Sequence, residues 1–181
     1  GTPNLPDIPT LERFAGAVTH SSGFADGAPW RDRDVLVFGT GTSAHDIAQD
    51  LHGNGARVTM IQRSPTLVVN IEPSAQLYDG VYLGPGPSLD DRDLINASMP
   101  LALMRRAHRL ITDEVRRLDK PLLDGLERAG FRLDFGEDGT GWPLKYRTRG
   151  GGYYFNVGCS DLIAAGAIPV VQYADIEGFA P

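Results

Sequence analysis

The chain has 181 residues, of which 41% are hydrophobic and 22% are charged, and its formal net charge at pH 7 is −6. This length suits one domain, and the composition is that of a globular protein with a buried core. The negative charge argues against binding nucleic acid, and no apolar run reaches the ~20 residues of a membrane span. The single cysteine, Cys159, excludes an internal disulfide, fits a reducing, cytoplasmic compartment, and is expected to be a buried apolar side chain.

Residues 1–34 contain four prolines and few periodic apolar positions. Each proline fixes its own backbone and disfavours a helix just before it. This pattern predicts an extended crossover segment, followed over residues 35–181 by an α/β domain.

The first part of that domain predicts a strand, a helix and a second strand. The apolar run at 35–38 is typical of a strand buried on both faces. Residues 43–52 place Ala44, Ile47, Ala48 and Leu51 on one helical face, and the glycines after them favour a helix end. Residues 57–63 form the second strand, so the unit is expected to be a right-handed parallel crossover.

The rest of the chain carries weaker signals. Residues 70–98 are turn-rich and predict irregular structure, within an insertion of about 70–145. Apolar residues at spacings of three and four predict a helix over 99–119, with His108 on its packed face, and a shorter helix follows Pro121. Further strands are expected at 131–136, 150–158 and 167–179.

The join between the first strand and helix carries a glycine pattern. Gly39, Gly41 and Ala44 fit G-x-G-x-x-A, interleaved with Thr40, Thr42 and Ser43. The first glycine permits a tight turn, the second lets a pyrophosphate approach the backbone, and the small third residue lets helix and strand pack closely. Because the pattern follows a strand and opens a helix, it predicts a Rossmann-like dinucleotide site.

The end of the second strand favours NADP(H) over NAD(H). Arg63 lies 24 residues after Gly39 and is followed by Ser64, and no acidic residue occupies the strand tip. A guanidinium matches a 2′-phosphate in charge and geometry, whereas an acidic side chain would hold a ribose 2′-OH. Arg147 and Arg149, beside three glycines, could grip a phosphate or face another domain, and the favoured interpretation is two solvated arginines before a strand. We recognise no metal-ligand constellation and no catalytic triad in the sequence.

A further motif lies upstream. Phe14, Gly16, His20 and Phe24 fit F-x-G-x-x-x-H-x-x-x-aromatic, directly before the glycine loop. This order resembles the class B flavin-dependent monooxygenases, which include flavin-containing monooxygenases, YUCCA-type enzymes and Baeyer–Villiger monooxygenases. The resemblance is specific over residues 1–69, and Ala25 after the motif argues against the Baeyer–Villiger branch.

The resemblance implies a two-dinucleotide enzyme in which NADPH reduces FAD and a flavin C4a-hydroperoxide oxygenates a small organic substrate. It implies that the glycine loop, Arg63 and Ser64 hold NADPH, and that the upstream motif belongs to an interdomain linker. A second glycine fingerprint for FAD is absent from the sequence. We therefore expect an NADPH-binding domain, inactive by itself, whose partner is an FAD-binding domain of the same polypeptide, with residues 150–181 returning toward it.

Two alternatives remain open at this point. The chain could be the pyridine-nucleotide domain of a flavin disulfide reductase, although its single cysteine provides no redox pair. It could also be a non-catalytic module that binds NADP(H).

Overall fold

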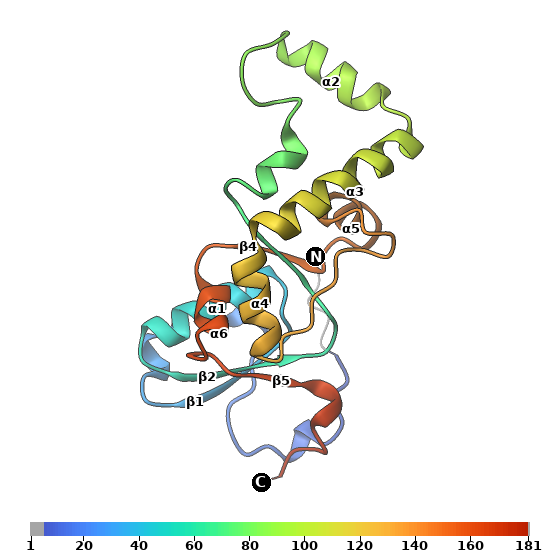
Figure 1. The fold of residues 1–181 in the computed structure, drawn as a ribbon. Helices are drawn as coiled ribbons and strands as arrows, with labels where there is room; N and C mark the ends of the chain where they lie inside the picture. Colours follow the sequence, from blue (N-terminus) through green and yellow to red (C-terminus); the bar gives the residue numbers. More distant parts are fainter. Residues whose placement is uncertain (1–5, 181) are drawn as a thin grey trace.

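The predicted β-α-β unit is present in the computed structural model, which describes residues 6–180. Strand β1 (Asp34–Phe38) leads into helix α1 (Thr42–Gly53), and strand β2 (Arg57–Gln62) returns parallel to β1. Phe38 is paired with Ile61, so the two strands end at the same edge of the sheet. The glycine loop and the residues after β2 therefore share that edge (Figure 1).

Within residues 6–180, five parallel-paired strands form two small sheets. Strand β5 (Val170–Gln172) joins β2 to give the order β1-β2-β5, and β3 (Leu67–Asn70) pairs with β4 (Tyr153–Asn156). The last two predicted strands are confirmed as β4 and β5, both shorter than expected. Strand β3 was not predicted, although its core residues, Val68 and Val69, are fully buried.

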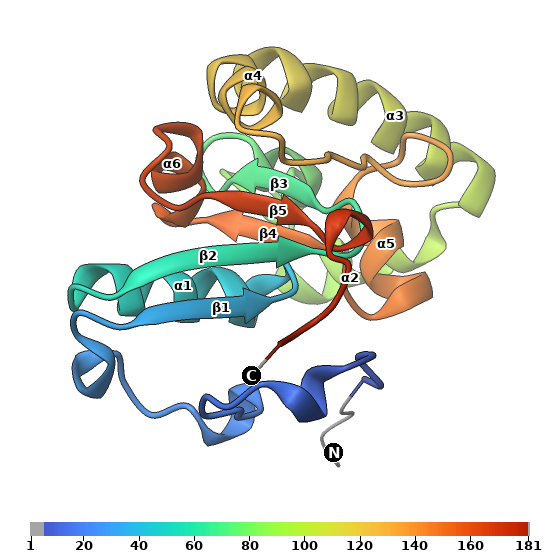
Figure 2. The ribbon, with the colours of Figure 1, turned by 90° about the horizontal axis from the view of Figure 1, so that it is seen from below.

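The main core lies between the three-stranded sheet and the helices on one of its faces. Helix α1 lies behind β1 and β2 in Figure 2, and α6 (Cys159–Ala164) packs against α1. The buried cluster combines residues from these elements with Leu126 and Phe131, and with Val68 of β3 and Tyr154 of β4. Cys159 is fully buried, which confirms the expected buried apolar side chain, and burial raises the pKa of its thiol to about 12.

The insertion contains more helix than the sequence indicated. Helices α3 (Leu101–Leu118) and α4 (Lys120–Arg128) confirm the two predicted helices, with a break just before Pro121. The prediction of irregular structure over 70–98 is wrong, because a 3₁₀ turn (Ala75–Asp79) and helix α2 (Leu89–Ser98) lie there. Helix α5 (Trp142–Arg149) was also missed.

The predicted strand at 131–136 is wrong as well. Its only ladder contact among the described residues is an isolated bridge between Leu133 and Thr66. The Gln62 side chain occupies the neighbouring hydrogen-bonding positions, accepting from the Arg132 amide at 2.7 Å and donating to the Arg132 carbonyl at 3.0 Å. The segment is thus held in an extended form by the Gln62 side chain and by one backbone bridge to Thr66, and it does not form a full strand ladder.

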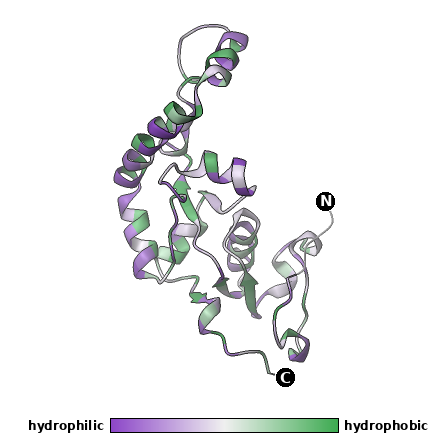
Figure 3. Cartoon of the chain, turned by 90° about the vertical axis from the view of Figure 1, so that its right-hand side faces the viewer, coloured by the Kyte–Doolittle hydropathy of each residue, from purple (hydrophilic) through white to green (hydrophobic). Residues whose placement is uncertain are grey.

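Helices α2 and α3 form an arm that projects from the sheets. In Figures 1 and 3, α2 lies far from the sheets, and α3 runs back toward them with hydrophilic and hydrophobic residues on its surface. No residue of α2 is buried, whereas Met104, Thr112 and Val115 of α3 are. Val115 joins a second, smaller core cluster with β3.

The two ends of the described chain meet beside the end of β1. Short 3₁₀ turns occur at Leu11–Arg13, Ser21–Gly23, Ala28–Trp30 and Tyr173–Asp175. The ring of Phe179 lies 6.3 Å from that of Phe14 and 5.8 Å from that of Phe38, measured between centroids. The start of the predicted crossover segment, residues 1–5, lies outside the described residues. Within residues 6–180, no helix has the length and apolarity needed to cross a bilayer.

Candidate functional site

The glycine loop links β1 to the first turn of α1. Gly39 has φ 105°, a left-handed conformation that favours glycine, and its amide donates to the Ile61 carbonyl at 2.9 Å. Gly41 occupies the N-cap position of α1, and no side chain caps that helix end. The amides of the first turn therefore point to the open edge of the sheet, where the helix dipole favours an anion.

Gly41 has no structural need to be glycine. Its φ of −83° and ψ of −177° suit any residue, and a Cβ added there would meet no atom within 4 Å. A side chain at this position would instead occupy the space in front of the helix. The lack of one leaves a backbone surface that a bulky anion such as a pyrophosphate can approach closely.

The remaining residues of the predicted loop have separate roles. Thr42 and Ser43 are exposed in the first turn, and the Thr42 hydroxyl donates to the Tyr153 carbonyl at 3.4 Å. Ala44 lies behind Gly39, with 4.0 Å between its Cβ and a Cβ built on that glycine. Thr40 differs from the expectation for a side-chain ligand, because its side chain is buried and faces Thr66. Only its backbone is placed to contribute to the loop's open side.

Arg63 and Ser64 follow β2 directly and are both exposed. Because β1 and β2 are parallel and in register, these two residues lie at the same sheet edge as the glycine loop. Among the ion pairs of residues 6–180, none involves Arg63. The structure thus brings together the uncapped start of α1 and an arginine that no carboxylate of residues 6–180 pairs with.

His45 is a buried residue of this region that the sequence analysis missed. Its ring is fully buried, stacks on Tyr154 with 3.9 Å between centroids, and places Nδ1 3.2 Å from the Gly41 carbonyl. Burial lowers its pKa to about 4, so the ring is neutral at pH 7. With Nδ1 donating to that carbonyl, His45 supports the loop from behind. Its spacing of three from Ala48 on the buried helix face was the available signal.

The upstream motif lies beside the loop without entering it. His20 caps a short 3₁₀ turn, its Nδ1 accepting from the Ser22 amide at 3.1 Å. Phe24 packs against the main core, and Phe14 contacts Phe179. Gly16 lies against the Phe14 ring, and a Cβ added there would lie 2.4 Å from that ring, which would have to shift. These contacts anchor the segment to the domain.

Other candidate residues are engaged by the chain itself. Arg149 pairs with Glu137, and Arg147 donates to the Met104 sulfur at 3.2 Å, both from helix α5. His108 lies at the base of the arm, where burial and then the charge of Arg147 lower its pKa. In the described part of the chain, no three His, Cys, Asp or Glu side chains cluster as metal ligands would.

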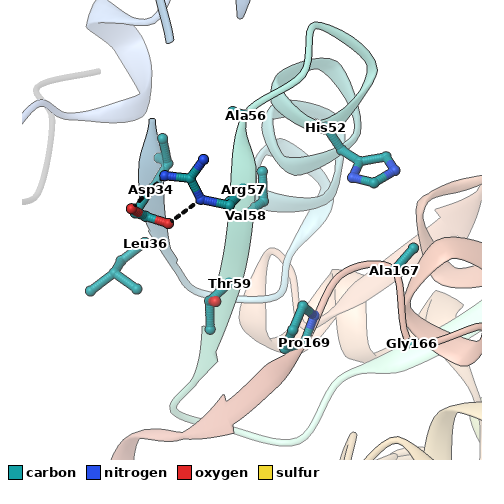
Figure 4. Close-up of a pocket in the computed structure, with 11 residues that line it drawn as sticks. Asp34, Leu36, His52, Ala56, Arg57, Val58, Thr59, Gly166, Ala167 and Pro169 are labelled. Atoms are coloured by element: carbon teal, nitrogen blue, oxygen red, sulfur yellow. Dashed lines mark hydrogen bonds and ion pairs between the residues drawn. The ribbon is translucent and has the colours of Figure 1, made fainter. Parts of the chain in front are cut away.

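A hollow of about 330 Å³ lies at the opposite end of the sheet (Figure 4). It is open, and it is bordered by the paired side chains of Asp34 and Arg57 and by Pro169. These residues are at the starts of their strands, whereas the ligand crevice of a parallel sheet lies beyond the strand ends. The hollow is therefore separate from the glycine loop.

Comparisons with known proteins agree with this geometry. Residues 2–79 match the family described as flavin-binding monooxygenase-like. The chain is 38% identical over 72 residues to the probable indole-3-pyruvate monooxygenase YUCCA10 of Arabidopsis thaliana, covering 40% of this chain and 19% of that protein. It is 37% identical over 70 residues to trimethylamine monooxygenase of Roseovarius sp. (strain 217), covering 38% and 16%.

A solved structure extends the likeness to the whole fold. Cyclohexanone monooxygenase from Rhodococcus sp. Phi1, in a structure bound to NADP+, aligns with a TM-score of 0.58 and 17% identity over 98% of this chain and 40% of that one. The fold is thus the parallel α/β, Rossmann-like class with a helical insertion, as predicted. The sequence resemblance to the flavin-containing monooxygenases is also confirmed, through residues 2–79. The chain spans less than half the length of these relatives.

Proposed function

We propose that this chain is the NADP(H)-binding domain of a longer flavin-dependent monooxygenase that acts on a small organic substrate. The observation that carries the proposal is Gly41, whose missing side chain serves neither its backbone conformation nor its packing. A glycine of this kind at the head of a helix is explained by close approach of a pyrophosphate. The monooxygenase relatives support the same assignment.

The residues present fit the coenzyme in two places. The amides at the start of α1 would hold the pyrophosphate, and Arg63 with Ser64 would hold the 2′-phosphate. NADPH bound there supplies the hydride that reduces FAD. The task of this chain's residues is to bind and orient that coenzyme, with His45 neutral and adding no charge behind the phosphates.

The domain assignment belongs to the same proposal. Residues 1–34 act as the crossover from an FAD-binding domain, and residues 35–181 form the NADP(H) domain with its insertion at about 70–145. Residues 150–181 return toward the FAD-binding domain of the same polypeptide. We expect the 181-residue chain without bound flavin to bind NADP(H) and to oxygenate nothing.

Calorimetric titration of NADP+ and NAD+ tests the assignment. We expect NADP+ to bind at least ~tenfold more tightly, about 1.4 kcal/mol, and Arg63→Ala to remove that preference. Arg33→Ala is the matched control, since Arg33 is an exposed arginine at the opposite end of the sheet. It should leave the preference unchanged.

Two results would contradict the proposal. One is a folded chain that binds neither dinucleotide, both in this form and joined to its FAD-binding domain. The other is an Arg63→Ala variant that keeps the full preference for NADP+.

A further inference from the structure

The turn between β2 and β3 is tied to the glycine loop by two buried hydroxyl groups. The Oγ1 atoms of Thr40 and Thr66 lie 2.6 Å apart, and these residues are 4% and 3% exposed. Thr66 Oγ1 also lies 3.4 Å from the Ser64 carbonyl. Either hydroxyl can donate in the short Thr40–Thr66 bond, and the Ser64 carbonyl accepts when the Thr66 hydrogen points to it. This relay runs from the glycine loop into the turn that carries Arg63.

Both ends of the same turn are fixed to a third segment. Gln62, which is 1% exposed, makes two of its three side-chain hydrogen bonds to the Arg132 backbone, and the third joins it to the Gln172 side chain. The Thr66 amide donates to the Arg132 carbonyl at 3.1 Å. Arg63 and Ser64, between these anchors, stay exposed. The turn is therefore held at its base and presents its two polar residues outward.

We propose that Thr66 is a positioning residue that sets the Arg63–Ser64 turn at the distance from the glycine loop that NADP(H) requires. The inference rests on the proposed function. NAD+ needs only the glycine loop, whereas NADP+ must reach the loop and the turn together at the one spacing its covalent structure allows. A loosened turn should therefore weaken NADP+ binding and spare NAD+ binding.

Thr66→Val keeps the shape of the side chain and removes the relay. We expect it to weaken NADP+ about tenfold and to change NAD+ affinity by less than about twofold. Thr66→Ser keeps the hydroxyl and should bind NADP+ like the unaltered chain. Thr59→Val, a threonine change elsewhere on β2, is the matched control and should have no effect. Urea unfolding of each variant checks that it is folded.

Thr66→Val leaves the buried Thr40 hydroxyl without its partner, which could prevent folding. The double variant Thr40→Val with Thr66→Val removes both hydroxyls and keeps an apolar contact, so it provides the same test in a folded protein. It should show the same selective loss of NADP+ affinity.

A double-mutant cycle shows whether Thr66 acts through Arg63. In an Arg63→Ala background, Thr66→Val should reduce NADP+ affinity by no more than about twofold, because the turn has already lost its charge. Additive losses of NADP+ affinity in the double variant would overturn the inference. So would a Thr66→Val variant that keeps its full preference for NADP+, or one whose affinities for NADP+ and NAD+ fall equally. In these cases, an Arg63→Ala effect confined to NADP+ would leave the proposed function standing. If the unaltered chain shows no preference for NADP+, both proposals fail.

Discussion

At the scale of single residues, the two loop glycines are expected to differ in their roles. Gly41→Ala should change the free energy of unfolding by less than about 0.5 kcal/mol, because the new methyl group meets nothing within 4 Å. It should nevertheless weaken dinucleotide binding, because that methyl group occupies the approach of the pyrophosphate. Gly39→Ala should instead destabilise the fold by about 1–2 kcal/mol, since φ is 105° there.

Urea unfolding and calorimetry of the two variants measure these effects separately. A Gly41→Ala variant that is as stable as the unaltered chain and binds the dinucleotide equally well would contradict the assigned role. If Gly41→Ala binds the dinucleotide more weakly but keeps its free energy of unfolding, the loss of binding does not come from a loss of fold.

His45 should make stability depend on pH. Its pKa is lowered from 6.5 to about 4 in the folded chain, so between these values the unfolded chain binds more protons. The contribution of neutral His45 to the free energy of unfolding is therefore complete above pH 6.5 and falls as the pH drops below 6.5. Below pH 4, about 3 kcal/mol of it has been lost. His45→Phe retains an aromatic ring against Tyr154 and removes this titration.

Urea unfolding at pH 7.0, 5.5 and 4.5 provides the measurement. We expect a shallower pH dependence in His45→Phe, with a residual slope of the same sign from His108, whose pKa is also lowered. Asp138, whose pKa is held low first by a hydrogen bond from Thr140, contributes only at more acid pH. Identical slopes in the two proteins would show that His45 is not the buried neutral group described.

At the scale of elements, the sequence predicts those whose residues are buried in a regular pattern. The β-α-β unit was predicted because α1 buries one face and its strands are apolar. The expected burial of β1 on both faces is wrong, because Val37 is buried whereas Leu36 on the other face is 46% exposed. Helix α2 buries no residue, so its sequence has no apolar period to detect. Its only local signal is Ser88, whose side chain caps the helix by accepting from the Asp91 amide at 3.2 Å.

The strand predicted at 131–136 is wrong for the opposite reason. Phe131, Leu133 and Phe135 alternate with polar residues, as in a strand, and they do face the protein. Alternation indicates which side chains are buried, but it does not indicate which groups form hydrogen bonds with the backbone amides and carbonyls. Here the distant Gln62 side chain and the single backbone bridge to Thr66 satisfy the backbone of this segment, which no local pattern encodes.

The lack of buried residues in α2 predicts its dynamics. Amides of Leu89–Ser98 should exchange with solvent by local opening, faster by about two orders of magnitude or more than those of α1. Ser88→Ala should accelerate that exchange further, because it removes the hydrogen bond that caps the first turn of α2. It should not alter global unfolding, because the cap stabilises this helix alone. Hydrogen exchange measured by mass spectrometry tests this, and protection in α2 equal to that in α1 would contradict it.

At the scale of the whole molecule, the site depends on contacts between segments that are far apart in sequence. The residue types of the glycine loop and the arginine turn could be read from the chain, because each follows a strand directly. Their support could not be predicted, since Thr40 meets Thr66 and His45 stacks on Tyr154 only after β3 and β4 are in place. The sequence thus indicates the residues that we propose to face the dinucleotide, and the fold determines what holds them in place.

The central claim is that NADP(H) binds across the glycine loop and the arginine turn. Amide chemical shifts of the labelled chain, recorded by NMR during titration with NADP+, test it most directly. The account predicts shifts at residues 39–44 and at Arg63 and Ser64, with α2 and the hollow beside Asp34 unchanged. Titration with NAD+ should shift the glycine loop and leave the arginine turn unaffected. Shifts centred on the Asp34 hollow or on the arm, with the glycine loop unchanged, would contradict the account.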